Sequence, residues 1–364
     1  MTGYALAIAL VAALACTGCD QGTQLNQATV TGSPIGVVAS NVGVDTSLPA
    51  DGRIEFEFDR YLVPATVNRQ SFALHSVGGS YPNPPPLVAY DPVARIVTIT
   101  PQTELEAGQN YVVDIATPAS PTDLNGLRAI DGATIATKFA KLEFPVGAAG
   151  GATAQAALPT IDFCNDIFPL LQPCAGPSCH GGTAPGPASG LRLDTPAAIT
   201  ATAVGRVSQE ANTGAVAGPA PAGAHFGVDM PIIDPGDGTG AGGNPGNSWL
   251  LYKLLLAVPT AASSASVAGC DGGTTAPTDV SSLHLVAWQP TSDADRANTW
   301  LARNASPELS DYVIGREMPF PADPSADPSK NTAALTIDDL ERISRWIAQP
   351  TNGQPLVPAT CPCQ

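Results

Sequence analysis

The sequence predicts a multidomain protein with an all-β sandwich followed by a mainly α, loop-rich domain. In the N-terminal part, short segments that alternate apolar and polar residues recur between turn sequences, as expected for the strands of a sandwich. A run of small residues at 147–157 interrupts this pattern and is typical of a linker. Beyond it the apolar residues have helical spacing, and the 36 glycines and 36 prolines of the chain favour short helices joined by long loops.

Residues 1–19 have the features of a lipoprotein signal. The apolar run at 4–15 is too short to cross a bilayer as a mature helix and has the length of a signal-peptide core. Small residues precede both Cys16 and Cys19, which resembles a bacterial lipobox. We expect acylation at Cys19, because the polar chain starts directly after it, with Cys16 as the alternative; residues 20–33 then form a tether. A cleaved secretory signal with incidental cysteines is the simpler alternative.

The charge of the chain limits the partners that it can have. The formal net charge is −16, and only 13% of the residues are charged. Nucleic acids and anionic lipid surfaces repel a polyanion, so we expect no nucleic-acid partner and no electrostatic membrane docking. The expected location is the bacterial cell envelope, periplasmic or at the outer membrane or cell surface, with the lipid anchor as the contact to the membrane.

The first folded domain is expected at 34–146. Apolar and polar residues alternate with a period of two at 54–58 and 96–100, and less strictly at 111–115, so each segment is predicted to be a half-buried strand. Turn sequences rich in Gly, Pro, Asn and Asp separate them at short intervals, which favours an antiparallel sandwich.

The same stretch resembles the bacterial Ig-like domains of surface proteins. The matching pieces are the strand at 54–58 followed by Asp59-Arg60, the segment Pro64 to Phe72, Val97 to Pro101, Leu105 to Tyr111, and Asp123 to Gly126. The resemblance implies a sandwich of about seven strands without catalytic residues. We expect a spacing or adhesive role for it.

The second domain is expected at 158–364 and contains a Gly/Ala/Pro-rich insert near Thr195 to Gly246. Short helices are predicted at 161–171, at 248–255 and at 335–347. The last of them has a capping box formed by Thr336 and Asp339, and its predicted apolar face consists of Leu340, Ile343 and Ile347.

The segment Cys174-Ala-Gly-Pro-Ser-Cys179-His180 is the most informative motif of the chain. Two cysteines followed directly by a histidine can hold a haem through two thioethers and supply an axial ligand to its iron. The usual motif has two residues between the cysteines and this one has four. A disulfide between Cys174 and Cys179 is the alternative; a structural zinc site is disfavoured, because the ligands are bunched and no second CxxC is present.

The remaining cysteines are expected to be consumed in disulfides, because an oxidising compartment leaves few free thiols. If Cys174 and Cys179 carry haem, two disulfides form among Cys164, Cys270, Cys361 and Cys363. If no haem is present, three disulfides form instead.

The order of motifs after residue 157 resembles the Planctomycete-type cytochrome c domain of exported bacterial proteins. The matching pieces are Cys179-His180-Gly181, Gly190 to Asp194, Asn244 to Leu251, Met318-Pro319 and the helix Leu340 to Ile347. The resemblance implies one covalent haem c with thioethers at Cys174 and Cys179. It also implies that His180 is the proximal axial ligand and Met318 the distal one.

Three other residues are competing axial ligands: Met230, His225 and His284. No GxSxG, HExxH, P-loop or dinucleotide motif is present, so an electron carrier is favoured over a catalyst. The expected function is single-haem electron transfer with a redox partner protein by a membrane-anchored lipoprotein. The alternative is a non-redox structural or binding lipoprotein of the envelope, in which Cys174 and Cys179 form a disulfide.

Overall fold

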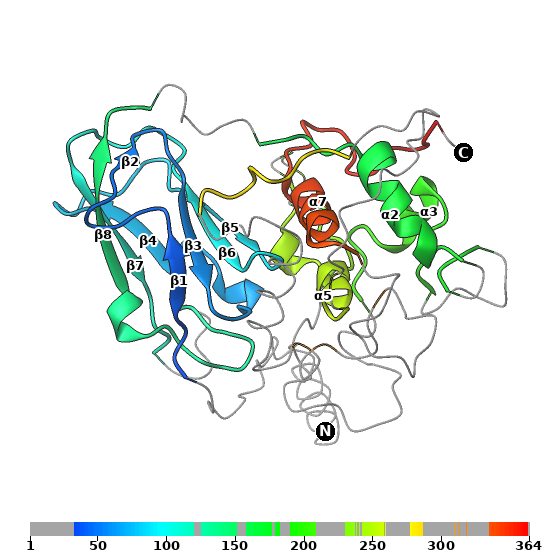
Figure 1. Cartoon of the computed structure of the whole chain (residues 1–364), viewed down its shortest axis with the longest axis horizontal. Coiled ribbons are helices and arrows are strands. Elements are labelled where there is room, and N and C mark those ends of the chain that lie inside the picture. The colour runs from blue at the N-terminus through cyan, green and yellow to red at the C-terminus, as the bar shows by residue number, and fades with distance from the viewer. Residues whose placement is uncertain are drawn as a thin grey trace, which may run out of the picture.

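The computed structural model contains a β-sandwich and a helical domain that lie side by side (Figure 1). The structure describes residues 33–119, 125–150, 158–176, 179–182, 190–208, 230–236, 242–257, 277–286 and 335–362, with single positions at 238, 240, 259, 309, 313 and 318. The predicted signal segment and both candidate lipidation sites, Cys16 and Cys19, lie outside the described residues.

The sandwich consists of two four-stranded sheets. In sheet order, one contains β1 (Val37–Ser40), β3 (Ile54–Phe58), β6 (Ile96–Thr100) and β5 (Leu87–Asp91), and the other contains β2 (Leu48–Pro49), β8 (Lys141–Gly147), β7 (Asn110–Ile115) and β4 (Phe72–Ser76). All neighbours pair antiparallel except β2 and β8. The three strands predicted from the alternating pattern are confirmed as β3, β6 and β7.

Large apolar side chains fill the space between the two sheets. Phe56 and Phe58 of β3 face Phe72 and Leu74 of β4 across the sandwich, and all four are almost fully buried. The rings of Phe58 and Phe72 meet edge to face with centroids 6.3 Å apart. Residues two apart along a strand point to the same face, which is why the alternating pattern produces this core.

The prediction that β3 is half-buried was wrong. Its outward-facing residues Glu55 and Glu57 are 1% and 0% exposed, so the strand is buried on both faces. The helical domain covers the outer face of this sheet: the segment 277–286, yellow in Figure 1, extends from α7 to the sandwich. Oε2 of Glu55 accepts hydrogen bonds from the backbone amides of Leu285 and Val286.

The helical domain is built from short helices. They are α2 (Phe168–Leu171), extended by helical turns at Phe163–Ile167 and Gln172–Cys174, then α3 (Pro196–Thr202), α5 (Trp249–Leu255) and α7 (Ile337–Ala348). Single 3₁₀ turns occur at Pro64–Thr66 and Thr137–Phe139 in the sandwich and at Pro245–Asn247 in the helical domain. The predicted capping box of α7 is confirmed, because the side chains of Thr336 and Asp339 each accept the other residue's backbone amide.

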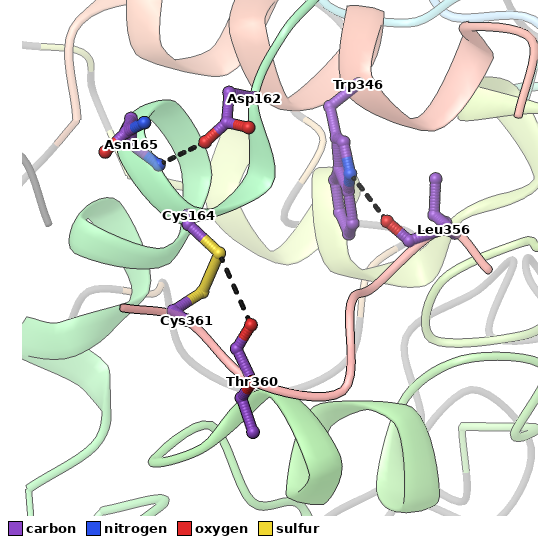
Figure 2. Close-up of a disulfide and its surroundings, with 7 residues drawn as sticks. All are labelled: Asp162, Cys164, Asn165, Trp346, Leu356, Thr360 and Cys361. Atoms are coloured by element: carbon purple, nitrogen blue, oxygen red, sulfur yellow. Dashed lines mark hydrogen bonds between the residues drawn. A yellow bond between two sulfur atoms is a disulfide. The ribbon is translucent and has the colours of Figure 1, made fainter. Parts of the chain in front are cut away.

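Helix α7 organises the core of the helical domain. Its predicted apolar face is confirmed, since Leu340, Ile343 and Ile347 are at most 1% exposed. On the same helix, Trp346 packs against Phe163 with ring centroids 5.3 Å apart. Its Nε1 donates a hydrogen bond of 3.2 Å to the backbone oxygen of Leu356 (Figure 2).

A disulfide between Cys164 and Cys361 ties the C-terminal segment to the helical turn before α2 (Figure 2). It joins residues 197 positions apart. This pairing is one of those expected among the four remaining cysteines; Cys270 and Cys363 lie outside the described residues.

The two ends of the predicted insert belong to the folded core. Helix α3 lies within the predicted insert, and Val204 and Val207 of the insert form β-bridges with Ile233 and Pro231. Ile199, Met230 and Ile233 are buried among the other core residues of this domain. The structure does not describe residues 209–229.

The described helices are too short to cross a bilayer: α7, with 12 residues, is the longest of them.

Candidate functional site

A cavity of about 320 Å³ lies within the helical domain. It is lined by residues from α3, α5 and the segments around them, and both His180 and Met318 are part of its wall. The wall combines apolar and polar groups, namely Gly190, Leu191, Ala201, Thr202, Arg206, Val207, Ser208, Ile232, Trp249, Leu250 and Lys253. The two predicted axial ligands therefore line the same cavity, although 138 sequence positions (318 − 180) separate them.

The backbone and ring contacts of His180 fix its position in the cavity wall. The residue is 5% exposed. Its backbone amide donates to the oxygen of Cys174 at 3.0 Å, and its backbone oxygen accepts from the amide of Leu193 at 2.9 Å. Nδ1 lies 3.2 Å from the backbone oxygen of Leu191. A carbonyl oxygen can only accept, so Nδ1 carries a proton in this contact. In the neutral ring Nε2 then has the lone pair, which is the form of imidazole that ligates a metal.

The two glycines after His180 allow the chain to pack closely at this point. A Cβ atom at Gly181 would collide with the backbone oxygen of Ala175. A Cβ atom at Gly182 would lie 2.5 Å from both Arg192 and Asp194, whose side chains form an ion pair of 2.8 Å. Gly181 is therefore required for the close approach to the backbone of Ala175, whereas the side chains next to Gly182 could move aside.

Cys174 and Cys179 are present as thiols in the structure. Cys174 is partly buried at the edge of the helical core, whereas Cys179 is exposed. Burial, together with the nearby sulfur of Cys179, raises the pKa of Cys174 to about 11. At neutral pH its sulfur is protonated and is a poor thiolate ligand. The described residues contain no group of three His, Cys, Asp or Glu side chains that could hold a metal ion.

Met318 is partly buried against the helical core. Its backbone amide donates a hydrogen bond of 3.2 Å to the backbone oxygen of Lys253 in α5, which connects it to the cavity wall. Among the competing ligands, Met230 is buried in the core and His284 lies between the two domains. Neither lines the cavity of His180. His225 lies outside the described residues.

Two cationic residues of the cavity wall, Lys253 and Arg206, were not identified from the sequence. Lys253 is 4% exposed, although lysine side chains are seldom fully buried. The sequence pattern could have indicated Lys253, because it is the only charged residue in the otherwise apolar helix Trp249–Leu255. Arg206 is exposed and donates from Nε to the backbone oxygen of Ala201. Both groups would favour an anionic group in or near the cavity.

The sandwich has detectable relatives. Residues 29–140 match the family of bacterial Ig-like domains. The resemblance noted in the sequence is thus confirmed for the sandwich, and a bacterial Ig-like domain fits an extracellular or cell-envelope protein. This match does not extend to the helical domain. No curated protein is significantly similar to the chain.

Solved structures of the surface-layer protein SbsC are also similar to part of the chain. A crystal structure of that protein shares 18% identity with a TM-score of 0.22, covering 32% of this chain and 14% of SbsC. The structure of its domains 1–6 shares 15% identity with a TM-score of 0.23, and the match covers 31% of this chain and 14% of that one. The structure of its N-terminal part shares 17% identity with a TM-score of 0.22, and the match covers 31% of this chain and 24% of that one. This chain therefore spans only a small part of those proteins, and a likeness of this size has no bearing on function.

Proposed function

We propose that the helical domain is an electron carrier with one covalent haem c, in an exported, lipid-anchored protein of the cell envelope. The observation that supports this most strongly is the meeting of His180 and Met318 in the wall of one cavity. A haem iron with two protein ligands needs one from each face of the macrocycle. His180 contributes an imidazole and Met318 a thioether to the wall of one cavity, and we assign them as the two ligands.

The residues around the cavity fit the requirements of a haem site. His180 has its Nδ1 committed to the Leu191 oxygen, which orients the ring and leaves the lone pair on Nε2. Cys179 directly precedes His180 and Cys174 lies six positions before it; both are thiols beside the cavity lining rather than in it. The addition of an S–H group across a vinyl group forms a thioether without a leaving group. Lys253 and Arg206 are placed to neutralise the carboxylates that a haem carries.

The chain's own contribution is to hold these groups and to restrict water. A bound haem would supply a one-electron couple at its iron. The apolar side chains of Leu191, Ile232, Trp249 and Leu250 in the wall lower the local polarity, which disfavours the more highly charged oxidation state. Ligation by the Met318 thioether favours the reduced state further and so raises the potential relative to a second histidine.

Expression in an export host with a haem-attachment system tests the proposal. The purified chain is expected to show a Soret band, to retain haem after denaturation, and to gain the mass of one haem. The double variant Cys174→Ser/Cys179→Ser should lose the covalent haem. The double variant Cys164→Ala/Cys361→Ala removes the other described cysteine pair and serves as the matched control; it should keep the haem.

A different result would favour the non-redox alternative. If the exported chain is colourless, and peptide mass analysis finds Cys174 and Cys179 joined in a disulfide, the protein is not an electron carrier. The helical domain would then serve binding or structure in the envelope.

A further inference from the structure

A second cavity, of about 480 Å³, lies between the two domains and is separate from the site of His180 and Met318. One wall comes from the outer face of the β3, β5 and β6 sheet, and includes Glu55, Ala89 and Asp91. The opposite wall comes from α7 and the segment 283–284. Its volume lies in the range of small-molecule sites, which is about 300–1,000 Å³.

The acidic groups of this cavity already have partners. Glu55 pairs with Nε of Arg53 at 2.8 Å through one oxygen and accepts two backbone amides, those of Leu285 and Val286, through the other. One oxygen of Asp91 accepts the amide of Val93 at 2.9 Å. The carboxylates are thus committed to the protein itself, and a cationic ligand would find few acceptors left.

The basic residue Arg345 has fewer hydrogen-bond partners in this cavity than the acidic residues have. Arg345 of α7 donates from Nε to the backbone oxygen of Pro159 at 3.0 Å, and within the described part of the chain its terminal nitrogens have no partner. Burial and the positive charge of nearby Arg53 both lower the pKa of Arg345, and no carboxylate among the described residues forms an ion pair with it. A bound anion would relieve this deficit.

His284 provides a second donor in the same wall. Its side chain is 7% exposed, and Nε2 lies 3.4 Å from an oxygen of Asp91. Nδ1 is buried and has no hydrogen-bond partner among the described residues. A buried imidazole nitrogen without a partner is costly, and a ligand acceptor would satisfy it.

The rest of the wall is largely apolar, with Leu87, Ala89, Leu158, Pro245, Leu283 and Ala348 among its residues. We propose that this interdomain cavity binds a small carboxylate with an apolar tail, held by the guanidinium of Arg345 and the ring of His284. A planar carboxylate matches the planar guanidinium, and the tail lies against the apolar wall. Such a ligand contacts both domains and therefore also stabilises their association.

Calorimetric titration of the purified full chain with hexanoate tests the proposal, with hexan-1-ol and hexylamine as probes that keep the tail and change the head group. Hexanoate is expected to bind, and the other two to bind at least tenfold more weakly. Arg345→Gln should weaken hexanoate binding about tenfold or more, since it removes a charge-assisted pair. Arg69→Gln, at an exposed position of the sandwich, makes the same chemical change and should leave binding unaffected.

A second variant separates loss of the site from loss of folding. Ala89→Leu leaves all charged groups in place and fills part of the cavity, so it should also abolish binding. Circular dichroism and thermal melting verify that each variant is folded. The proposal is overturned if hexanoate does not bind at millimolar concentration, if hexan-1-ol binds equally well, or if folded Arg345→Gln and Ala89→Leu bind as the parent does. These outcomes do not depend on whether the sample contains haem, because the two cavities are lined by different residues.

Discussion

The carboxylate of Glu55 in strand β3 accepts a hydrogen bond of 2.6 Å from the backbone amide of Leu285, 230 positions later in the chain. Arg53, which pairs with Glu55 at 2.8 Å, donates from its other end to the backbone oxygen of Leu283. Gly246 adds a close contact, because a Cβ atom there would lie 2.7 Å from the ring of Tyr90. Buried polar contacts thus join the outer face of the sandwich to the helical domain.

Replacement of Glu55 should destabilise the whole protein. The substitution Glu55→Gln removes the charge that Arg53 faces while both remain buried, at 1% and 4% exposure. Breaking one partner of a buried pair costs about 3–5 kcal/mol, and we expect the free energy of unfolding in urea to fall by that amount. Glu104→Gln, at an exposed position of the sandwich, should change it by less than about 0.5 kcal/mol. Equal stability of the two variants would show that the contact between the domains is unimportant.

Met318 and Met230 form a matched pair of methionines for testing axial ligation. Met318 lines the cavity of His180, whereas Met230 is 4% exposed in the core and does not. In haem-loaded protein, Met318→Leu should abolish the sulfur-to-iron charge-transfer absorption of the ferric form and lower the reduction potential. Covalent attachment at Cys174 and Cys179 should survive.

Met230→Leu should leave the spectrum and the potential of the haem-loaded protein as they are and change only the stability, by less than about 1.5 kcal/mol. If Met318→Leu also leaves the spectrum unchanged, the distal ligand is another residue. His225 would then be substituted next, followed by His284 and Met230.

The disulfide between Cys164 and Cys361 should contribute substantially to stability, because it closes a loop across 197 positions. Long loops lose the most entropy on cross-linking in the unfolded chain, and the expected contribution is about 2–5 kcal/mol. The double variant Cys164→Ala/Cys361→Ala should therefore unfold at lower urea concentration. Treatment of the parent protein with a reductant should reproduce this shift, whereas the double variant should show no further response at this bond.

His284 should make stability depend on pH. Burial lowers its pKa, but the nearby carboxylates of Asp91, Glu341 and Glu55 outweigh burial and raise the pKa above the usual value. A raised pKa in the folded state stabilises the protein fully below the unfolded value of about 6.5, and this contribution is lost as pH rises through the folded pKa. Arg53 and Arg345 line the same cavity and oppose protonation to some extent.

The free energy of unfolding, measured from pH 5 to pH 9 for the parent and for His284→Gln, isolates this contribution. The difference between the two should shrink as pH rises above about 6.5. His75 also has a raised pKa, caused first by its hydrogen bond of 2.7 Å to Asp114, so His75→Gln is the appropriate comparison. A pH-independent difference for His284→Gln would mean that this ring does not titrate in the range.

Anchoring is tested at the N-terminus. Cys19→Ser is expected to abolish labelling with a fatty-acid analogue and to release the protein from membranes. Labelling that persists in this variant and disappears in Cys16→Ser would move the acylation site to Cys16. Labelling that neither substitution removes would leave an exported protein without a lipid anchor.

Local patterns predicted the elements but not how they are covered. The alternation at 54–58 predicted strand β3, because side chains two apart on a strand share a face whatever lies beyond it. The same alternation predicted that Glu55 and Glu57 face water, and both are buried. The segment that covers Glu55 is 230 positions away, so no local pattern could reveal it.

The sequence by itself determined the elements whose causes lie within a few residues. These include the alternating strands, the capping box of α7, and the motif that places His180 directly after Cys179. Only the tertiary structure decided that Met318 joins His180 at one cavity, that His284 lies between the domains, and that Arg345 faces a second cavity. The physical reason is that helix capping and side-chain periodicity act within a few residues of the chain, whereas cavities and buried charges arise from contacts between segments that are distant in sequence.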